Sequence, residues 1–148
     1  MRSRALTRGG SGAAGRIGRS GLRVLVVEDD DVVAEGLRLL LEQEHAVQIA
    51  LGGRQALDLL LGATAFDAVL CDLMMPGMSG IDLFHALRTS SPGLERRLVF
   101  MTGGAFTNEA ESFLAAIDNP RVEKPFDFSS VNQLLRRAAE RSRPVCAD

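Results

Sequence analysis

The order of apolar runs and helical patterns along the chain restricts its fold more than any other feature. Short runs rich in branched side chains occur at residues 22–27, 45–50, 67–71, 98–101 and 121–123. After each run, apolar residues recur at helical spacing, beginning at residue 31 and then over 53–61, 81–88, 108–117 and 128–141. This fivefold alternation predicts an α/β domain: a doubly wound (βα)5 parallel sheet with right-handed crossovers and helices on both faces.

Length and composition set the number of domains. At 148 residues, the chain is expected to form one domain over 22–142, flanked by tails at 1–21 and 143–148. No apolar run approaches the roughly 18 residues that span a bilayer, so we expect no membrane segment. Of the two cysteines, Cys71 falls in a predicted buried strand and Cys146 in the C-terminal tail. We therefore expect no disulfide, a usage typical of a reducing cytoplasm.

The first 21 residues form a basic, Gly- and Arg-rich segment that we expect to be disordered. It is interpreted as a solvated tail, a cloning remnant or a start codon assigned too early, with a basic interaction arm as the alternative. It holds five of the 17 basic residues and none of the 19 acidic ones, which leaves a formal charge of −7 on the remainder. That charge, and the lack of a helix-turn-helix pattern, predict no DNA binding by this chain.

Charged residues follow three of the predicted strands. Glu28 and Asp29 end the first run, Asp72 ends the third, and Lys124 follows the fifth. The carboxyl ends of parallel strands meet at one edge of the sheet, where open α/β folds bind their ligands. These side chains are therefore predicted to form one pocket, suited to a divalent cation, a carboxylate nucleophile and an ammonium group facing a phosphoryl group.

The acids have separable roles in such a pocket. An Asp can act as a nucleophile toward phosphorus and form an aspartyl phosphate, which points to Asp72. Its negative charge repels the phosphoryl donor, so a bridging Mg²⁺ is expected. Asp29 and Asp72 are the predicted carboxylate ligands, and Glu28 is long enough to act through a metal-bound water.

The remaining polar groups are suited to the phosphoryl oxygens. Lys124 supplies a positive point charge, and Thr102, at the end of the fourth strand, supplies a hydroxyl. Gly103 and Gly104 leave room for the backbone to approach the same place.

Together these motifs make residues 22 to about 142 resemble the receiver domain of two-component response regulators. The resemblance rests on Val26-Val27-Glu28-Asp29-Asp30, Asp72-Leu73-Met74-Met75-Pro76-Gly77-Met78-Ser79-Gly80, Met101-Thr102-Gly103 and Glu123-Lys124-Pro125-Phe126. It implies a flavodoxin-like sheet of strand order 2-1-3-4-5.

The resemblance also assigns roles to residues. It implies that Asp72 accepts a phosphoryl group from a histidine kinase or histidine phosphotransfer protein. It implies Mg²⁺ bound by Asp29, Asp72 and the Met74 backbone carbonyl, with Glu28 in an outer position. Thr102 is similar to the family's switch hydroxyl, and Lys124 to its invariant lysine, whose bond to Pro125 is expected to be cis.

One position departs from the family's usual pattern, and two others bear on the lifetime of the phosphoryl group. Arg121 stands where an aromatic residue normally precedes the lysine, so the usual hydroxyl–aromatic relay is in doubt. Our hypothesis is that Arg121 pairs with an acid or a partner in one state. Met74 and Gly104 resemble rate-tuning positions, and neither orients an attacking water well, which predicts a long-lived phosphoryl group.

The predicted function is that of a phosphoacceptor, not an enzyme, that signals by phosphorylation-dependent contact with a downstream protein. The chain is also similar to receiver modules at the C-terminal ends of hybrid histidine kinases. The alternatives are a phosphorylation-independent interaction module and, less favoured, a phosphate-ester hydrolase of similar fold. Such a hydrolase needs a second acid two residues after the nucleophile, where this chain has Met74. His45 and His85 are interpreted as surface or half-buried structural residues, and Cys71 as inert core.

Overall fold

The fold is taken from a computed structural model that describes residues 21–103, 107–125 and 127–141. The predictions for the two tails and for Gly104 lie outside these residues, apart from Gly21 at the end of the N-terminal segment. The strands are β2 (Arg23–Val27), β3 (Ala46–Ala50), β4 (Ala68–Asp72), β5 (Leu98–Thr102) and β6 (Arg121–Glu123). The helices are α1 (Asp31–Leu41), α2 (Gly53–Leu60), α3 (Gly80–Ser90), α4 (Asn108–Ala116) and α5 (Phe128–Arg141), with a short 3₁₀ helix, η1 (Leu94–Arg97).

The strands form a single parallel sheet in the order β3-β2-β4-β5-β6. Since β2 is the first strand along the chain, this is the order 2-1-3-4-5, and the predicted doubly wound topology is confirmed. The order reverses between β2 and β4, and open α/β sheets bind their ligands at the carboxyl ends of the strands at such a reversal.

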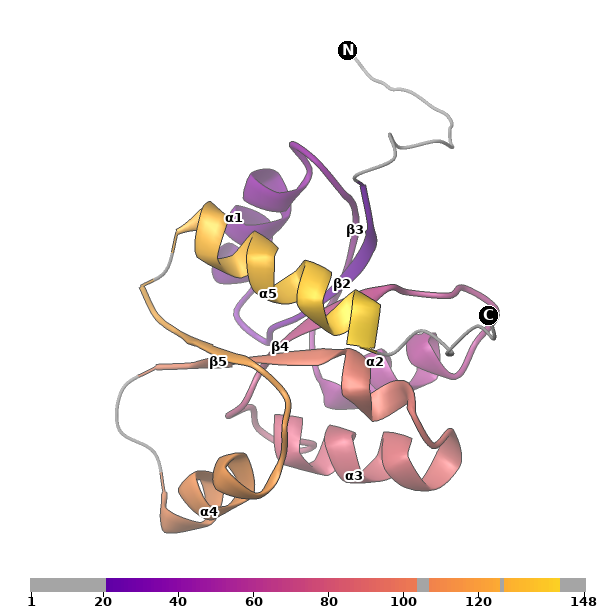
Figure 1. Cartoon of the computed structure of the whole chain (residues 1–148), viewed down its shortest axis with the longest axis vertical. Coiled ribbons are helices and arrows are strands. Elements are labelled where there is room, and N and C mark those ends of the chain that lie inside the picture. Colours follow the sequence, from indigo (N-terminus) through magenta and orange to yellow (C-terminus); the bar gives the residue numbers. More distant parts are fainter. Residues whose placement is uncertain (1–20, 104–106, 126, 142–148) are drawn as a thin grey trace.

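Alternate residues of β2, β3, β4 and β5 contribute to two separate hydrophobic cores, one on each face of the sheet. In Figure 1, α1 and α5 lie on one side of the sheet and α3 and α4 on the other. In β4, Val69 and Cys71 face the core beneath α2, α3 and α4, whereas Ala68 and Leu70 face the core beneath α1 and α5. All four are fully buried. A strand buried on both faces has a continuous apolar sequence, which explains the uninterrupted apolar run over residues 68–71.

Side-chain caps fix where the helices begin. The Asp30 carboxylate accepts from the backbone N–H groups of Val32 and Val33 at the start of α1. Ser79 and Asp82 form a reciprocal capping box at the start of α3. The cap of α1 leaves Asp29, one residue earlier, available to the sheet edge.

His45 is more deeply buried than the predicted surface or half-buried position. It is 4% exposed, and its Nδ1 accepts from the Leu22 backbone N–H at 3.0 Å. Its Nε2 lies 2.6 Å from the Asn132 Oδ1, which fixes the neutral tautomer with the proton on Nε2. The ring therefore links the start of β2 to α5, and it is a structural residue as expected.

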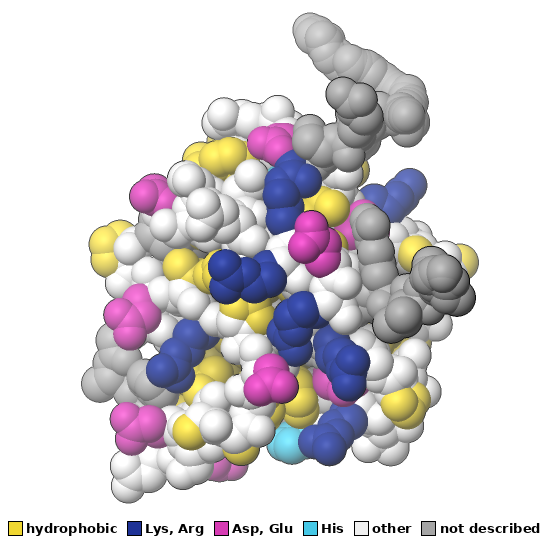
Figure 2. All heavy atoms as spheres, in the orientation of Figure 1, with side chains coloured by type: hydrophobic (Ala, Val, Ile, Leu, Met, Phe, Trp, Pro, Cys, Tyr) yellow, Lys and Arg dark blue, Asp and Glu magenta, His cyan; other side chains and the backbone are white. Residues whose placement is uncertain are grey.

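The surface carries mixed charge. In Figure 2, basic and acidic side chains lie interspersed over the face that α5 crosses. Arg136 of α5 forms an ion pair with Glu44, and the Arg141 guanidinium donates to the Asp118 carbonyl at 3.4 Å. Within the described ranges, the helices are all too short or too polar to cross a membrane.

Candidate functional site

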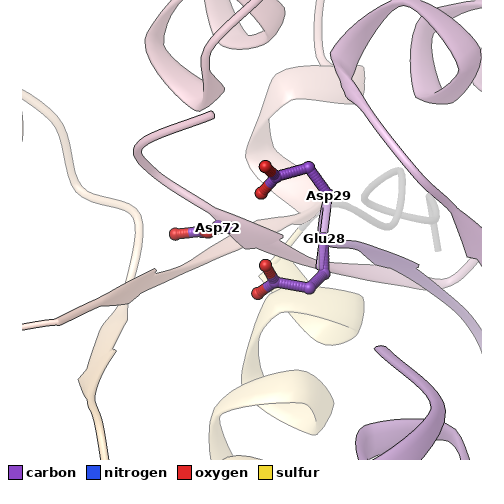
Figure 3. Close-up of side chains that lie close together, drawn as sticks. All are labelled: Glu28, Asp29 and Asp72. Carbon is purple, nitrogen blue, oxygen red and sulfur yellow. The ribbon is translucent and has the colours of Figure 1, made fainter. Parts of the chain in front are cut away.

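The predicted polar side chains meet at the carboxyl edge of the sheet. Glu28 and Asp29 follow β2, Asp72 is the last residue of β4, Thr102 ends β5, and Lys124 follows β6. Figure 3 shows the carboxylates of Glu28, Asp29 and Asp72 close together beside these strand ends. Two strands that are far apart in sequence, β2 and β4, thus contribute acids to one place.

The three carboxylates are close enough to share one ligand. One oxygen from each of Glu28, Asp29 and Asp72 lies within 4.8 Å of the others. The Glu28 side chain is 3% exposed and that of Asp72 is 13% exposed, whereas Asp29 is open to solvent. The cluster is therefore buried on the Glu28 side and accessible on the Asp29 side.

Backbone groups hold two of these acids in place. The Asp30 backbone N–H donates to Glu28 Oε2 at 3.2 Å, so the turn that begins α1 also orients Glu28. The Met74 backbone N–H reaches back to Asp72 Oδ1 at 3.4 Å. Each carboxylate keeps a second oxygen for other partners.

Lys124 is the cation beside the cluster. Its Nζ lies 3.4 Å from Glu28 Oε1 and 4.0 Å from Asp72 Oδ2. The Lys124 backbone N–H donates to the Thr102 carbonyl at 2.9 Å, which ties the end of β6 to the end of β5. The Lys124–Pro125 peptide bond is cis, as expected.

Burial and mutual repulsion perturb the acids. Burial raises the pKa of Glu28 above its ordinary value, and the neighbouring Asp72 carboxylate raises it further. The pKa of Asp72 is likewise raised, chiefly by burial, although Lys124 acts in the opposite direction. The Lys124 ammonium group therefore does not fully compensate the cost of holding the charged Glu28 and Asp72 carboxylates in this partly buried site.

This residual negative charge fits a hard divalent cation. The donor atoms are all carboxylate oxygens, the ligand type that Mg²⁺ prefers, and the open side at Asp29 leaves space for water ligands. The structure thus brings together the three acids of the predicted metal-binding set, Glu28, Asp29 and Asp72.

Three other predicted residues are not part of the carboxylate cluster. Thr102 is 4% exposed at the end of β5, and Met74 is 51% exposed in the loop after β4. Arg121 is exposed on β6 and pairs in register with Phe100. Among the residues that the structure describes, Arg121 has no ion pair, so its predicted acidic partner stays a hypothesis.

Two glycines beside the site were not predicted from the sequence. A Cβ on Gly80 would lie 2.7 Å from the Asp72 carbonyl oxygen, and one on Gly53 would lie 2.5 Å from the Met78 carbonyl oxygen. Both glycines stand at the first position of a helix that follows a loop at this edge. That position was the only signal in the sequence, and it does not reveal the contact.

Comparisons with known proteins agree with this geometry. The family model of the response regulator receiver domain matches residues 24–136. Response regulator MprA of Mycolicibacterium vanbaalenii is 32% identical over 124 residues, which are 83% of this chain and 52% of that protein. The chain thus spans about half the length of the curated relatives it matches.

Solved structures share the fold. A sensor protein from Polaromonas sp. JS666 superposes with a TM-score of 0.70 at 28% identity, over 82% of this chain and 98% of that one. The receiver domain of the sensor histidine kinase PA1611 from Pseudomonas aeruginosa PAO1 has a TM-score of 0.70 at 24% identity, over 81% and 98%. The latter contains a magnesium ion coordinated in its active-site cleft. On its sequence match and its fold, the present chain belongs to the response regulator receiver domain family.

Proposed function

We propose that Asp72 accepts a phosphoryl group from a histidine kinase or histidine phosphotransfer protein, and that the phosphorylated chain signals by binding a downstream protein. The observation that carries this proposal is the arrangement at the sheet edge: three carboxylates within 4.8 Å of one another, with Lys124 Nζ 4.0 Å from Asp72. Residues 22–142 form the receiver unit of this proposal.

The transfer follows from the position of Asp72. One carboxylate oxygen of Asp72 forms a bond to phosphorus while the bond from phosphorus to the donor's imidazole nitrogen breaks. The imidazole keeps the electron pair of that bond and takes up a proton. Lys124 lies within reach of the transferred oxygens and stabilises their charge, and the Thr102 hydroxyl is proposed to bind another of them.

The acidic cluster is proposed to bind Mg²⁺. Asp29, Asp72 and the Met74 carbonyl would hold the ion, with Glu28 acting through a water molecule. When bound, Mg²⁺ neutralises charge on the carboxylates and the phosphoryl oxygens and orients them. The raised pKa values of Glu28 and Asp72 are consistent with this proposal, since burial, and to a lesser extent repulsion between neighbouring carboxylates, disfavours their charged forms, and a bound cation would offset both effects.

Phosphorylation is proposed to change the shape of the sheet edge. The added phosphoryl group brings roughly two negative charges and strong acceptor oxygens, which attract Lys124 and the Thr102 hydroxyl. The loops that carry these residues then favour a second arrangement, which a partner protein binds more tightly. The Met74 side chain has no group that orients an attacking water, so the phosphoryl group is expected to be long-lived.

The hydrolase alternative has no support at the site. The position two residues after Asp72 is the exposed, non-ionisable Met74. The phosphorylation-independent alternative predicts that no phosphoryl adduct forms that requires both Mg²⁺ and Asp72. The following experiment tests this.

The experiment is phosphorylation by a small donor, read by intact mass. The protein is incubated with acetyl phosphate and Mg²⁺, and one phosphoryl adduct per chain is expected. The adduct should be lost on adding a chelator and in Asp72→Asn. Asp58→Asn, which changes an exposed acid of α2, is the matched control and should behave like the wild type. An adduct independent of Mg²⁺ and Asp72, or no adduct at all, would contradict the proposal for small donors, and incubation with a phosphorylated histidine donor would then decide it.

A further inference from the structure

The loop between β4 and α3 is closed on itself by backbone contacts. The Gly80 backbone N–H donates to the Leu73 carbonyl at 3.0 Å, which joins the two ends of the loop. Gly80 also packs directly on the chain at Asp72, since a Cβ there would lie 2.7 Å from the Asp72 carbonyl oxygen. The loop therefore starts and ends against the proposed phosphoacceptor, and it includes Met74, whose carbonyl is a proposed metal ligand.

The far side of this loop rests on the first residue of α2. A Cβ on Gly53 would lie 2.5 Å from the Met78 carbonyl oxygen, 2.7 Å from Met78 Cγ and 2.9 Å from Met78 Cβ. The nearest of these atoms belongs to the backbone, so a side chain at Gly53 would have to move the loop or the helix. Gly53 is itself buried, and Met78 packs against the core beneath α2 and α3.

Neighbouring glycines do not make such a contact. Gly52, the residue that caps α2, has extended backbone, and a Cβ there would meet nothing within 4 Å. Gly77, inside the loop, has a φ of +74° and open space around it. The close approach is thus specific to Gly53, although both it and Gly52 lie at the same helix terminus.

We propose that Gly53 is a positioning residue for the phosphorylation site: its direct contact with Met78 sets the loop that carries Met74 and thereby the affinity for Mg²⁺. The reasoning rests on the proposed function, because it requires the acidic cluster to bind the metal. Displacing the loop would move the Met74 carbonyl and the Met74 N–H that donates to Asp72 Oδ1. Groups that orient metal ligands typically change metal affinity by about 10- to 100-fold when they are altered.

The test is a calorimetric Mg²⁺ titration of the wild type, Gly53→Ala and Gly52→Ala, each well below its melting temperature. We expect the dissociation constant of Gly53→Ala to rise about tenfold and its rate of phosphorylation by acetyl phosphate to fall in parallel. Gly52→Ala should stay within about twofold of the wild type. Ala is a poor helix cap, so this control also loses stability and shows that lower stability alone does not weaken metal binding.

The outcomes separate the two proposals. If the wild type binds Mg²⁺ and Gly53→Ala binds it as tightly, the positioning role is wrong and the proposed function stands. If the wild type binds no Mg²⁺, the metal site and the inference both fail. If Gly53→Ala does not fold, Met78→Ala replaces it, because this change loosens the same contact from the loop side. Mg²⁺ binding by Met78→Ala equal to that of Gly52→Ala would then overturn the positioning role.

Discussion

Replacing the proposed phosphoacceptor should stabilise the metal-free protein. In Asp72→Asn, a neutral side chain of the same shape takes the place of a carboxylate whose pKa folding raises, mainly by burial. The change removes repulsion from Glu28, whose oxygen lies within 4.8 Å, and attraction from Lys124 at 4.0 Å. At an effective dielectric constant of about 20, each of these is roughly 3.5–4 kcal/mol in isolation.

These two electrostatic interactions largely cancel, so the burial of the Asp72 carboxylate decides whether Asp72→Asn raises or lowers the unfolding free energy. Lys124 is one-third exposed, and solvent screening reduces its attraction further. We expect Asp72→Asn to be about 1 kcal/mol more stable than the wild type at neutral pH without metal, or about 3–5 °C in melting temperature.

Mg²⁺ should make the wild type more stable than Asp72→Asn. A ligand at 100 times its dissociation constant stabilises the folded state by about 2.7 kcal/mol, and the Asn variant loses part of this gain with its carboxylate. The pH dependence has a definite sign as well. Because folding raises the pKa of Asp72, the wild-type protein loses stability as the pH rises from the ordinary pKa of 3.8 through the pKa in the folded state. The stability advantage of Asp72→Asn should therefore appear above this pH range and vanish below it.

The assay is urea unfolding followed by far-ultraviolet circular dichroism, since the chain contains no Trp or Tyr. The wild type, Asp72→Asn and the control Asp58→Asn are compared with a chelator and with saturating Mg²⁺. An Asp72→Asn protein that is less stable than the wild type in the presence of the chelator would refute the view that the cluster carries uncompensated charge.

Three further changes test other parts of the structure. Lys124→Gln should slow phosphorylation by acetyl phosphate by about 10²-fold, because it removes the cation that faces the phosphoryl oxygens, and an unchanged rate in the mass assay would disprove this role. Burial lowers the pKa of His45, so the unfolded state binds the proton more readily and unfolding free energy should fall as pH drops below about 6.5. That pH slope should be absent in His45→Phe and retained in His85→Ala, as measured by urea titrations. Ser79→Ala removes the cap of α3 and should cost about 1 kcal/mol of unfolding free energy; a loss near zero would show that the cap is not needed.

The topology and the acidic cluster could be predicted because both depend on patterns within short segments. Strands buried on both faces produce continuous apolar runs, and parallel strands bring their last residues to one edge. Glu28, Asp29 and Asp72 therefore lie together provided that β2 and β4 are neighbours in the sheet, as they are here. The order itself came from the resemblance between motifs rather than from periodicity.

Local chemistry could not distinguish between adjacent residues. By residue type alone, Asp29, Asp30 and Asp31 are equally suitable helix caps, and only the structure shows that Asp30 caps α1 while Asp29 joins the acidic cluster at the sheet edge. The four-residue η1 helix was not predicted, since so short a segment has no measurable periodicity.

Contacts between residues far apart in the sequence could not be predicted. His45 is hydrogen-bonded to Asn132, which is 87 positions away, and no spacing rule links the two residues. The contact between Gly53 and Met78 likewise depends on how α2 packs beside the loop after β4. In both cases the tertiary fold, rather than local propensity, gives the residue its role.

The central claim is that Asp72 becomes an acyl phosphate, and its most direct test is chemical trapping of that bond. The protein is phosphorylated with acetyl phosphate and Mg²⁺, reduced with borohydride, digested and sequenced by mass spectrometry. Reduction of an aspartyl phosphate yields homoserine, so the account predicts homoserine at position 72 and at no other aspartate. An unmodified Asp72 beside a reduced or phosphorylated residue elsewhere would contradict it.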